Sequence, residues 1–299
     1  MKEQIKKLKE EKNAVILAHY YVPEEVQEIA DYVGDSFYLA KVAKESTADK
    51  IVFCGVSFMG ESAKILNPDK KVLMPDTTAD CPMAHMVKDG FIEEMRQKYD
   101  DLAVVCYINS TAALKCLCDV CVTSSNAVKI VKSLPNKNIL FVPDKNLGRF
   151  VAEQVPEKNV ILNDGCCPIH ANLEAAQIRD AKQKHPEALV LSHPECEEGV
   201  LALSDFIGST AEIIAYAKNS QQKEFIIGTE EGVIYKLQTD NPDKRFYFPK
   251  SGFCCPDMKL NTLETVLDVL IKEDKTIEVD ESLRKGALLP LDRMLELGK

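Results

Sequence analysis

Short apolar runs alternate with amphipathic stretches along the whole chain. The run at residues 14–19 has no polar alternation, which is typical of a strand buried on both faces of a parallel sheet. Helical stretches at 23–30 and 36–45 and further apolar runs at 50–53 and 71–74 follow it. Strands that alternate with helices in this way predict parallel sheets with helices on both faces. Ligands of such sheets bind beyond the carboxyl ends of the strands.

The same pattern occurs three times. Its clearest marker is a cysteine followed by proline at Cys81, Cys167 and Cys255, with separations of 167 − 81 = 86 and 255 − 167 = 88 residues. Each unit also has an apolar run that ends in a polar ring residue, an aspartate twelve residues later, and a loop rich in hydroxyl groups. The ring residues and aspartates are His19 with Asp31, Tyr107 with Asp119, and His193 with Asp205. A repeat of this length predicts three homologous α/β units.

The repeat also sets the expected domain boundaries. The first unit is expected at residues 1–81, the second at 82–167 and the third at 168–255, with the tail 256–299 packed against the first. We expect a linking helix at 84–99 and a last helix near 291–297. The predicted fold class is α/β, with three α/β/α sandwich domains that are related by a pseudo-threefold axis and surround a central site.

Composition narrows the class of protein. A net charge of −10 argues against a nucleic-acid-binding surface. No apolar run approaches the ~18 residues of a membrane span, and the charged start is no signal peptide. Eleven cysteines without such a signal indicate a reducing, cytoplasmic location.

Three thiols that converge on a pseudo-threefold axis suit a metal centre. Cys81, Cys167 and Cys255 could hold an iron–sulfur cluster with one iron open, or a zinc ion with an open position. An open metal position acts as a Lewis acid. The alternative is three buried thiols at equivalent loop positions. Cys166 and Cys254 double two of these sites, and the following proline selects Cys167 and Cys255 as ligands.

The remaining cysteines favour a structural interpretation. Cys116, Cys118 and Cys121 form a C-x-C-x-x-C pattern that resembles a metal fragment, but the other two units have no cysteine there. Packing in the core or on a helix face is therefore favoured. The same interpretation applies to Cys54, Cys106 and Cys196.

The hydroxyl loops at 34–36, 123–125 and 208–210 each precede a predicted helix. Free N–H groups at a helix N-terminus bind phosphate or carboxylate, although ordinary capping by serine or threonine is common. Three such loops at one edge suggest a substrate with several anionic groups.

Polar residues at the ends of the first strands are the acid–base candidates. His19 and His193 occupy the same repeat position and suit acid–base chemistry or anion binding. Glu195 is a candidate base, with a solvated loop acid as the alternative, and His170 lies three residues after Cys167. The residues two positions beyond the ring residues are Tyr21, Asn109 and Glu195.

Together these motifs resemble the quinolinate synthase family over nearly the whole chain. The matching stretches are residues 18–19, 30–36, 67–70, 79–84, 107–111, 123–127, 143–148, 167–170, 193–196, 208–210, 228–230 and 255–259. Asp257 stands where asparagine is more usual in the family, and the extra cysteines depart from its pattern.

The resemblance implies a transferase of the dehydratase type in de novo NAD biosynthesis. Such an enzyme condenses iminoaspartate with dihydroxyacetone phosphate, releases phosphate and water, and closes the ring to quinolinate. It also implies a 4Fe–4S cluster with three cysteine ligands, which correspond to Cys81, Cys167 and Cys255, and one open iron. A transient contact with L-aspartate oxidase, the source of iminoaspartate, is left open.

The resemblance further assigns site residues. Catalytic roles fall to Tyr21, Tyr107, His193 and Glu195. The implied substrate contacts are His19, Ser36, Tyr107, Ile108, Asn109, Ser124, His193, Pro194, Glu195 and Thr210.

Two other classes of protein compete with this interpretation. A zinc-dependent aldolase or hydrolase of a sugar phosphate would use the same thiolates. An electron-transfer protein would require four thiolates and no cavity for anions, which the three hydroxyl loops disfavour.

Overall fold

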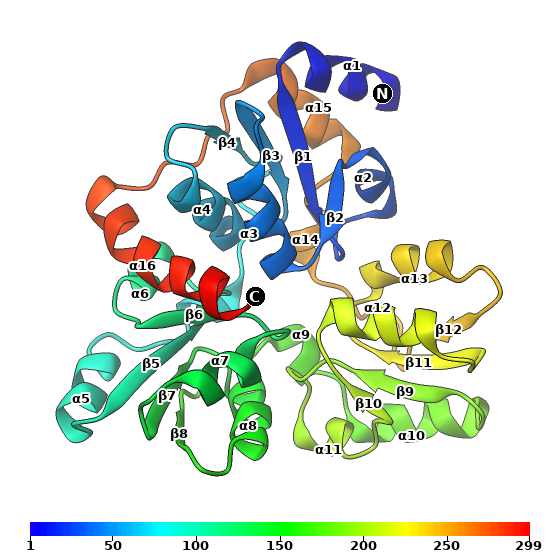
Figure 1. Ribbon diagram of the computed structural model, residues 1–299. Helices are drawn as coiled ribbons and strands as arrows, with labels where there is room; N and C mark the ends of the chain where they lie inside the picture. The colour runs from blue at the N-terminus through cyan, green and yellow to red at the C-terminus, as the bar shows by residue number, and fades with distance from the viewer.

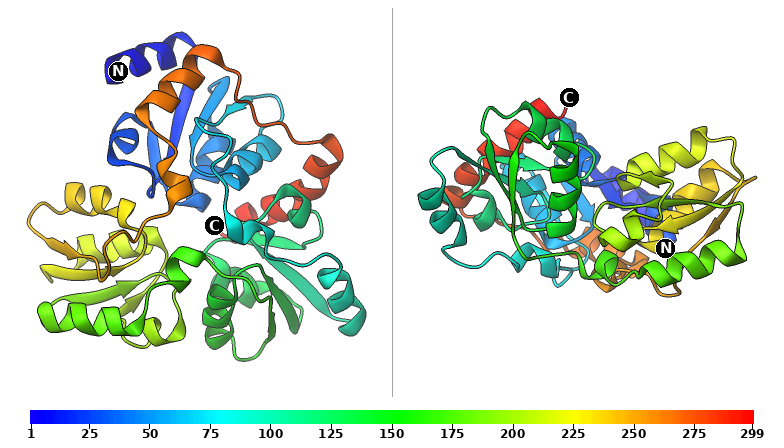
Figure 2. Two further views of the ribbon diagram at one scale, coloured as in Figure 1. Left: turned by 180° about the vertical axis from the view of Figure 1, so that it is seen from behind. Right: turned by 90° about the horizontal axis from the view of Figure 1, so that it is seen from below.

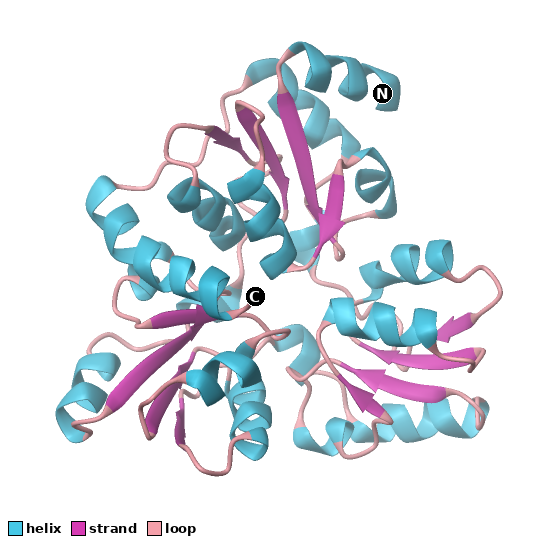
Figure 3. Ribbon diagram, viewed as in Figure 1, coloured by secondary structure: helices cyan, strands magenta, loops and turns pink.

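The computed structural model describes residues 1–299 and consists of three lobes arranged around a common centre (Figure 1). Each lobe contains a four-stranded parallel sheet, and helices cover both of its faces (Figure 3). The predicted α/β class with three sandwich units is confirmed. No helix has the length and apolar character needed to cross a membrane.

The three sheets share one topology. The strand orders are β2-β1-β3-β4, β6-β5-β7-β8 and β10-β9-β11-β12. The first unit comprises α1 (Lys2–Glu11), β1 (Ala14–His19), α2 (Glu24–Ile29), β2 (Tyr32–Gly34), α3 (Ser36–Glu45), β3 (Lys50–Cys54), α4 (Ser57–Leu66) and β4 (Lys71–Leu73).

The other two units follow the same plan. The second comprises η1 (Pro82–His85), α5 (Phe91–Lys98), β5 (Leu102–Tyr107), α6 (Ala112–Lys115), β6 (Val120–Val122), α7 (Ala127–Ser133), β7 (Asn138–Val142), α8 (Lys145–Gln154) and β8 (Asn159–Leu162). The third comprises α9 (Pro168–Ala171), α10 (Ala175–Lys184), β9 (Leu189–Ser192), α11 (Glu198–Leu201), β10 (Phe206–Ile207), α12 (Thr210–Asn219), β11 (Glu224–Gly228), η2 (Glu231–Val233), α13 (Ile234–Asp240) and β12 (Arg245–Tyr247).

The tail holds α14 (Pro256–Lys259), α15 (Leu263–Lys272) and α16 (Glu281–Leu297). Helix α15 packs against α1, α2 and β3 of the first unit. Helix α16 lies between the first and second units and contacts α4 on one side and α6, β6 and α7 on the other (Figure 2). The tail therefore joins the two units.

Two predicted helices have different extents in the structure. The expected linking helix at 84–99 is replaced by η1 and the shorter α5, because Gly90 adopts a left-handed conformation (φ 77°) at the start of α5. The last helix, expected near 291–297, already begins at Glu281 and contains Pro290. The proline concealed the helical pattern of residues 281–290, since a proline inside a helix is normally unfavourable.

The repeated aspartates have a structural role. In each unit, the aspartate that comes after the helix following the first strand accepts the N–H of a residue in that strand at 2.7 or 2.8 Å. These pairs are Asp31 with Ile16, Asp119 with Val104, and Asp205 with Val190. Each carboxylate fixes the start of an edge strand (β2, β6 or β10) against its neighbour (β1, β5 or β9). The polar ring residue lies at the end of that neighbouring strand.

The repeated lysines have an equally structural role. Lys70, Lys158 and Lys244 each donate to backbone carbonyls at or just beyond the end of the helix that follows the hydroxyl loop. A lysine at this place satisfies carbonyls that the helix leaves unpaired. These contacts explain why the Pro-Asp-Lys or Pro-Glu-Lys step recurs in every unit.

The hydrophobic core is not evenly shared. One cluster of 58 buried residues runs through the first unit, the second unit and the tail. The third unit is built on two separate clusters of 9 and 8 residues. The third unit thus has a core of its own, against which Tyr20 and Tyr21 of the first unit pack.

Candidate active site

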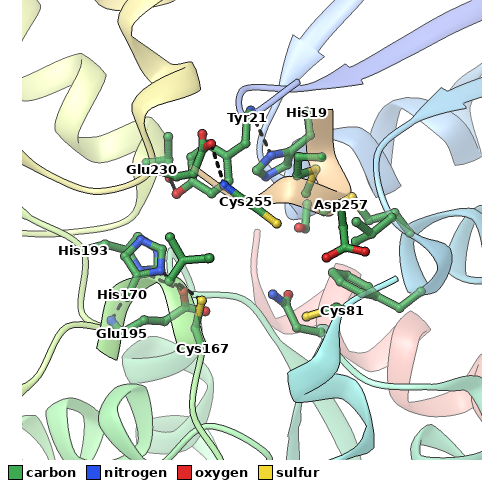
Figure 4. Close-up of a pocket in the computed structure, with 18 of the residues that line it drawn as sticks. His19, Tyr21, Cys81, Cys167, His170, His193, Glu195, Glu230, Cys255 and Asp257 are labelled. Atoms are coloured by element: carbon green, nitrogen blue, oxygen red, sulfur yellow. Dashed lines mark hydrogen bonds and ion pairs between the residues drawn. The ribbon is translucent and has the colours of Figure 1, made fainter. Parts of the chain in front are cut away.

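A cavity of about 150 Å³ lies where the three units meet. Its lining comes from loops that follow the carboxyl ends of strands in all three units and includes Cys81, Cys167 and Cys255. Figure 4 shows the sulfur atoms of these cysteines facing the same space. The doubled neighbours Cys166 and Cys254 do not line the cavity.

The three cysteine loops have the same local structure. Cys81, Cys167 and Cys255 each precede a one-turn helix whose first residue is proline. All three have extended backbone angles, with ψ between 109° and 115°. Proline is well suited to the first position of a helix because its nitrogen needs no acceptor there. The Cys-Pro step therefore places each sulfur at the end of a rigid turn.

The donor set is compatible with an iron–sulfur site. Burial raises the pKa of Cys81 to about 12 and that of Cys167 well above its ordinary value. Such thiols ionise readily only beside a bound metal, which stabilises the thiolate. The thiols of a single tetrahedral zinc would lie about 3.8 Å apart. The only three donors within 4.8 Å of one another are Cys167, His170 and Glu195, so the three cysteines are spread more widely than the ligands of one ion.

His19 and His193 have matching hydrogen bonds. His19 Nδ1 accepts from Tyr21 N at 3.2 Å, and His193 Nδ1 accepts from Glu195 N at 3.3 Å. Burial lowers the pKa of each imidazole to about 3, so both rings are neutral at pH 7. The proton of each ring must then reside on Nε2. Both histidines are therefore N–H donors rather than cations.

Glu195 is a buried anion, not a solvated loop acid. Only 3 % of the residue is exposed, and its Oε2 lies 2.7 Å from His170 Nδ1. Burial by itself would raise the pKa of the carboxyl, but the neighbouring His193 and His170 lower it to about 2. Its Oε1 has no hydrogen-bond partner. One carboxylate oxygen is thus held by a histidine and the other is available to a substrate.

Tyr21 reaches from the first unit into the third. Its hydroxyl lies 2.6 Å from Thr210 Oγ1 and 2.7 Å from Thr229 Oγ1. Thr229 Oγ1 in turn lies 3.0 Å from His170 Nε2. A continuous chain of hydrogen bonds through Thr229 and His170 therefore connects Tyr21 to Glu195.

The hydroxyl loops do more than cap helices. Asp35 caps α3 and Ser209 caps α12, so the neighbouring Ser36 and Thr210 are not needed as caps. Ser36, Ser124 and Thr210 all line the cavity. Ser124 Oγ lies 3.2 Å from His193 Nε2. The lining contains no lysine or arginine, so hydroxyl groups, N–H groups and neutral imidazoles are its own donors to an anion.

Most of the remaining implied contacts also reach the cavity. Tyr107 and Asn109 line it, and Asn109 Oδ1 is buried without a partner. Ile108 and Pro194 are buried but do not line the cavity. The carbonyl of Ile108 instead accepts from the buried Lys115 Nζ at 2.9 Å.

Several residues of the site were not selected from the sequence. Thr229, Glu230 and Asp257 have hydrogen-bond partners in other stretches of the chain, whereas Asp35 caps α3 and accepts from the nearby Tyr38 N. Asp257, the departure from the family pattern, accepts the N–H of Asp80 at 3.2 Å. Asp144 and Glu230, which lie 230 − 144 = 86 residues apart, could have been found as acids at one repeat position.

The fold and the site define an enzyme in which three α/β units surround a cavity lined by thiols. A family profile described as quinolinate synthetase A protein matches residues 3–296. A quinolinate synthase of Caldicellulosiruptor bescii is 56 % identical over 298 residues, which cover 100 % of this chain and 98 % of that protein. Those of Fusobacterium nucleatum and Clostridioides difficile are 54 % and 50 % identical, over 99 % of this chain and 99 % and 97 % of theirs.

The chain belongs to the quinolinate synthetase A family. It is an enzyme of NAD biosynthesis that acts on small molecules, as the resemblance implied.

Proposed function

We propose that this chain forms quinolinate from iminoaspartate and dihydroxyacetone phosphate, and that Cys81, Cys167 and Cys255 hold a 4Fe–4S cluster with one open iron. The convergence of three equivalent thiols on a cavity with one buried carboxylate anion carries the proposal.

When bound, the cluster supplies a Lewis acid for the loss of a substrate hydroxyl. Two acid–base groups of the protein accompany it. Glu195, whose carboxylate also faces the hydroxyl of Tyr107, takes a proton from the substrate carbon or nitrogen. Tyr21 supplies a proton to the departing group, and its hydroxyl is kept in place by Thr210 and Thr229.

The remaining cavity residues bind and orient the substrates. His19 and His193 donate from Nε2 to carboxylate or phosphate oxygens, and Ser36, Ser124 and Thr210 add hydroxyl donors beside the helix N-termini. Tyr107 and Asn109 provide further polar atoms of the lining, and the buried Ile108 and Pro194 are chain neighbours of these and the other substrate-facing residues. Placing the reaction in a cavity between three units limits the access of water to iminoaspartate, which hydrolyses readily.

We also propose unit boundaries at 81/82, 167/168 and 255/256, which the identical strand orders support. A cytoplasmic location and a transient contact with L-aspartate oxidase would suit an oxygen-sensitive cluster and an unstable substrate.

Anaerobic conversion of the two substrates tests the proposal. Purified protein should form quinolinate and phosphate in equal amounts, and the Cys81→Ala variant should form neither. A colourless, zinc-containing protein that forms no quinolinate would contradict the proposal and favour the aldolase or hydrolase.

A further inference from the structure

A polar joint connects the loop of Tyr21 in the first unit to the loop of Cys255. Lys259 Nζ donates to the carbonyl of Tyr21 at 2.6 Å and lies 2.8 Å from Glu230 Oε1. The same Glu230 Oε1 accepts the N–H of Cys255 at 3.0 Å. One lysine and one carboxylate therefore link the backbone of a substrate-facing residue to the backbone of a metal-facing one, as Figure 4 shows in part.

This joint adds polar contacts where the loop of Tyr21 meets the third unit. The buried cores of the two units are separate clusters, and Tyr20 and Tyr21 are the residues of this loop that pack against the core of the third unit. Glu230 is 1 % exposed, and its other oxygen, Oε2, accepts the N–H of Gly232 at 2.7 Å. A buried carboxylate with three donors is a rigid point of attachment, because its hydrogen bonds are charge-assisted.

Gly232 provides the space for this arrangement. A Cβ atom added to Gly232 would lie 2.8 Å from Glu230 Oε2, 2.8 Å from Tyr21 Cα and 2.9 Å from Lys259 Nζ. The three groups of the joint therefore converge on the one position that has no side chain. Since Tyr21 Cα is backbone, any larger residue at position 232 must displace the loop of Tyr21.

The second unit shows what the lysine adds. Asp144 occupies the repeat position of Glu230 and accepts the N–H of Cys167 at 2.9 Å. The residue four positions after Cys167 is Ala171, whereas the residue four positions after Cys255 is Lys259. A carboxylate that accepts a cysteine N–H is thus present in both places, but the lysine occurs only after Cys255, at the start of the tail, where it reaches the carbonyl of Tyr21.

We propose that Glu230 and Lys259 are positioning residues that fix Tyr21 relative to Cys255, with Gly232 giving them room. The proposal rests on the proposed function, since it assigns the joint to the same site. Lys259 does not line the cavity and touches no substrate position, so it acts through the loop of Tyr21.

Three variants of the cluster-loaded enzyme test the proposal. Lys259→Met should lower kcat about 10- to 100-fold, the cost of a misplaced catalytic group, with little change in KM for dihydroxyacetone phosphate or in iron content. Lys259→Arg should restore most of kcat, because a guanidinium also donates to both acceptors. Gly232→Ala should reproduce the loss with Lys259 and Glu230 both present. Lys236→Met removes a lysine paired at the surface of α13 and is the matched control.

Hydrogen exchange provides a readout that does not depend on activity. In Lys259→Met and Gly232→Ala, peptides covering residues 20–28 should exchange faster, while peptides of β5 and β7 should keep their protection. Unchanged exchange at 20–28, or an equal loss of protection throughout the chain, would overturn the proposal. If the parent enzyme forms no quinolinate, the proposed function fails, whereas the exchange experiment still decides whether the joint holds the loop.

Discussion

His170 Nδ1 lies 2.7 Å from Glu195 Oε2, and both side chains are almost completely buried. His170 follows the cavity-lining Cys167 by one helical turn, and Glu195 follows the first strand of the third unit. No lysine or arginine pairs with Glu195, so the imidazole determines where its negative charge points. The free oxygen of Glu195 then faces the reactants.

Replacing the Glu195 carboxylate should stop proton transfer without loss of iron or sulfide from the site. The Glu195→Gln variant keeps the shape and the contact with His170 but cannot act as a base. We expect kcat to fall about 10²- to 10⁴-fold in steady-state assays, with iron and sulfide content unchanged. A variant with full turnover would remove Glu195 from the mechanism.

The hydroxyl of Tyr21 should be necessary for turnover and for good packing. Tyr21→Phe leaves the buried hydroxyl of Thr210 without its side-chain partner and Thr229 with His170 alone. We expect kcat to fall at least about 10²-fold and stability to fall by about 1–3 kcal/mol in urea unfolding. The neighbouring Tyr20→Phe is the control, and equal effects of the two variants would argue against a specific role.

The neutral state of the two histidines predicts acid sensitivity. The folded pKa of His19 and His193 is about 3, and the ordinary pKa is 6.5. Between these values the unfolded chain binds protons that the folded chain excludes, so stability is full above pH 6.5 and decreases as the pH falls.

At pH 5 each histidine should cost about 2 kcal/mol relative to pH 7.5. The His193→Gln variant should therefore lose less stability between these two pH values than the parent, by about that amount, in urea unfolding of cluster-free, reduced protein. Equal losses in the two proteins would show that His193 is charged in the folded state.

Lys115 should stabilise the loop that carries Tyr107 and Asn109. It is fully buried, and its ammonium donates to the carbonyls of Ile108 and Ser110. Lys115→Met removes the ammonium donor from both carbonyls, although Ile108 O still accepts the N–H of Ser110 at 2.8 Å, and we expect a loss of about 2–4 kcal/mol in urea unfolding. The exposed Lys132→Met on α7 should change stability by less than about 0.5 kcal/mol. A small effect at Lys115 would mean that water replaces the ammonium.

The fold could be predicted largely because the same sequence pattern occurs three times in the chain. An apolar run, an aspartate and a Pro-Asp/Glu-Lys step recur, and the structure explains each by a local contact such as Asp31 with Ile16 N. Features that occur once were harder. Pro290 concealed most of α16, and Gly90 divided the expected linking helix.

Site residues that occupy the same position in every repeat could be predicted from the sequence. Contacts between residues of different units could not. Cys81, Cys167 and Cys255 share one loop structure, so their convergence followed from the threefold pattern. The contacts of Tyr21 with Thr229 and Lys259 join residues more than 200 positions apart, and no periodicity indicates such pairs.

Cysteine ligation is the central claim, and iron and sulfide analysis of serine variants tests it most directly. After anaerobic reconstitution, Cys166→Ser and Cys254→Ser should retain about four irons and four sulfides per chain, the content of one 4Fe–4S cluster, whereas Cys81→Ser, Cys167→Ser and Cys255→Ser should each lose most of both. If Cys255→Ser kept a full cluster while Cys254→Ser lost it, or if the parent protein bound only zinc, the account would be contradicted.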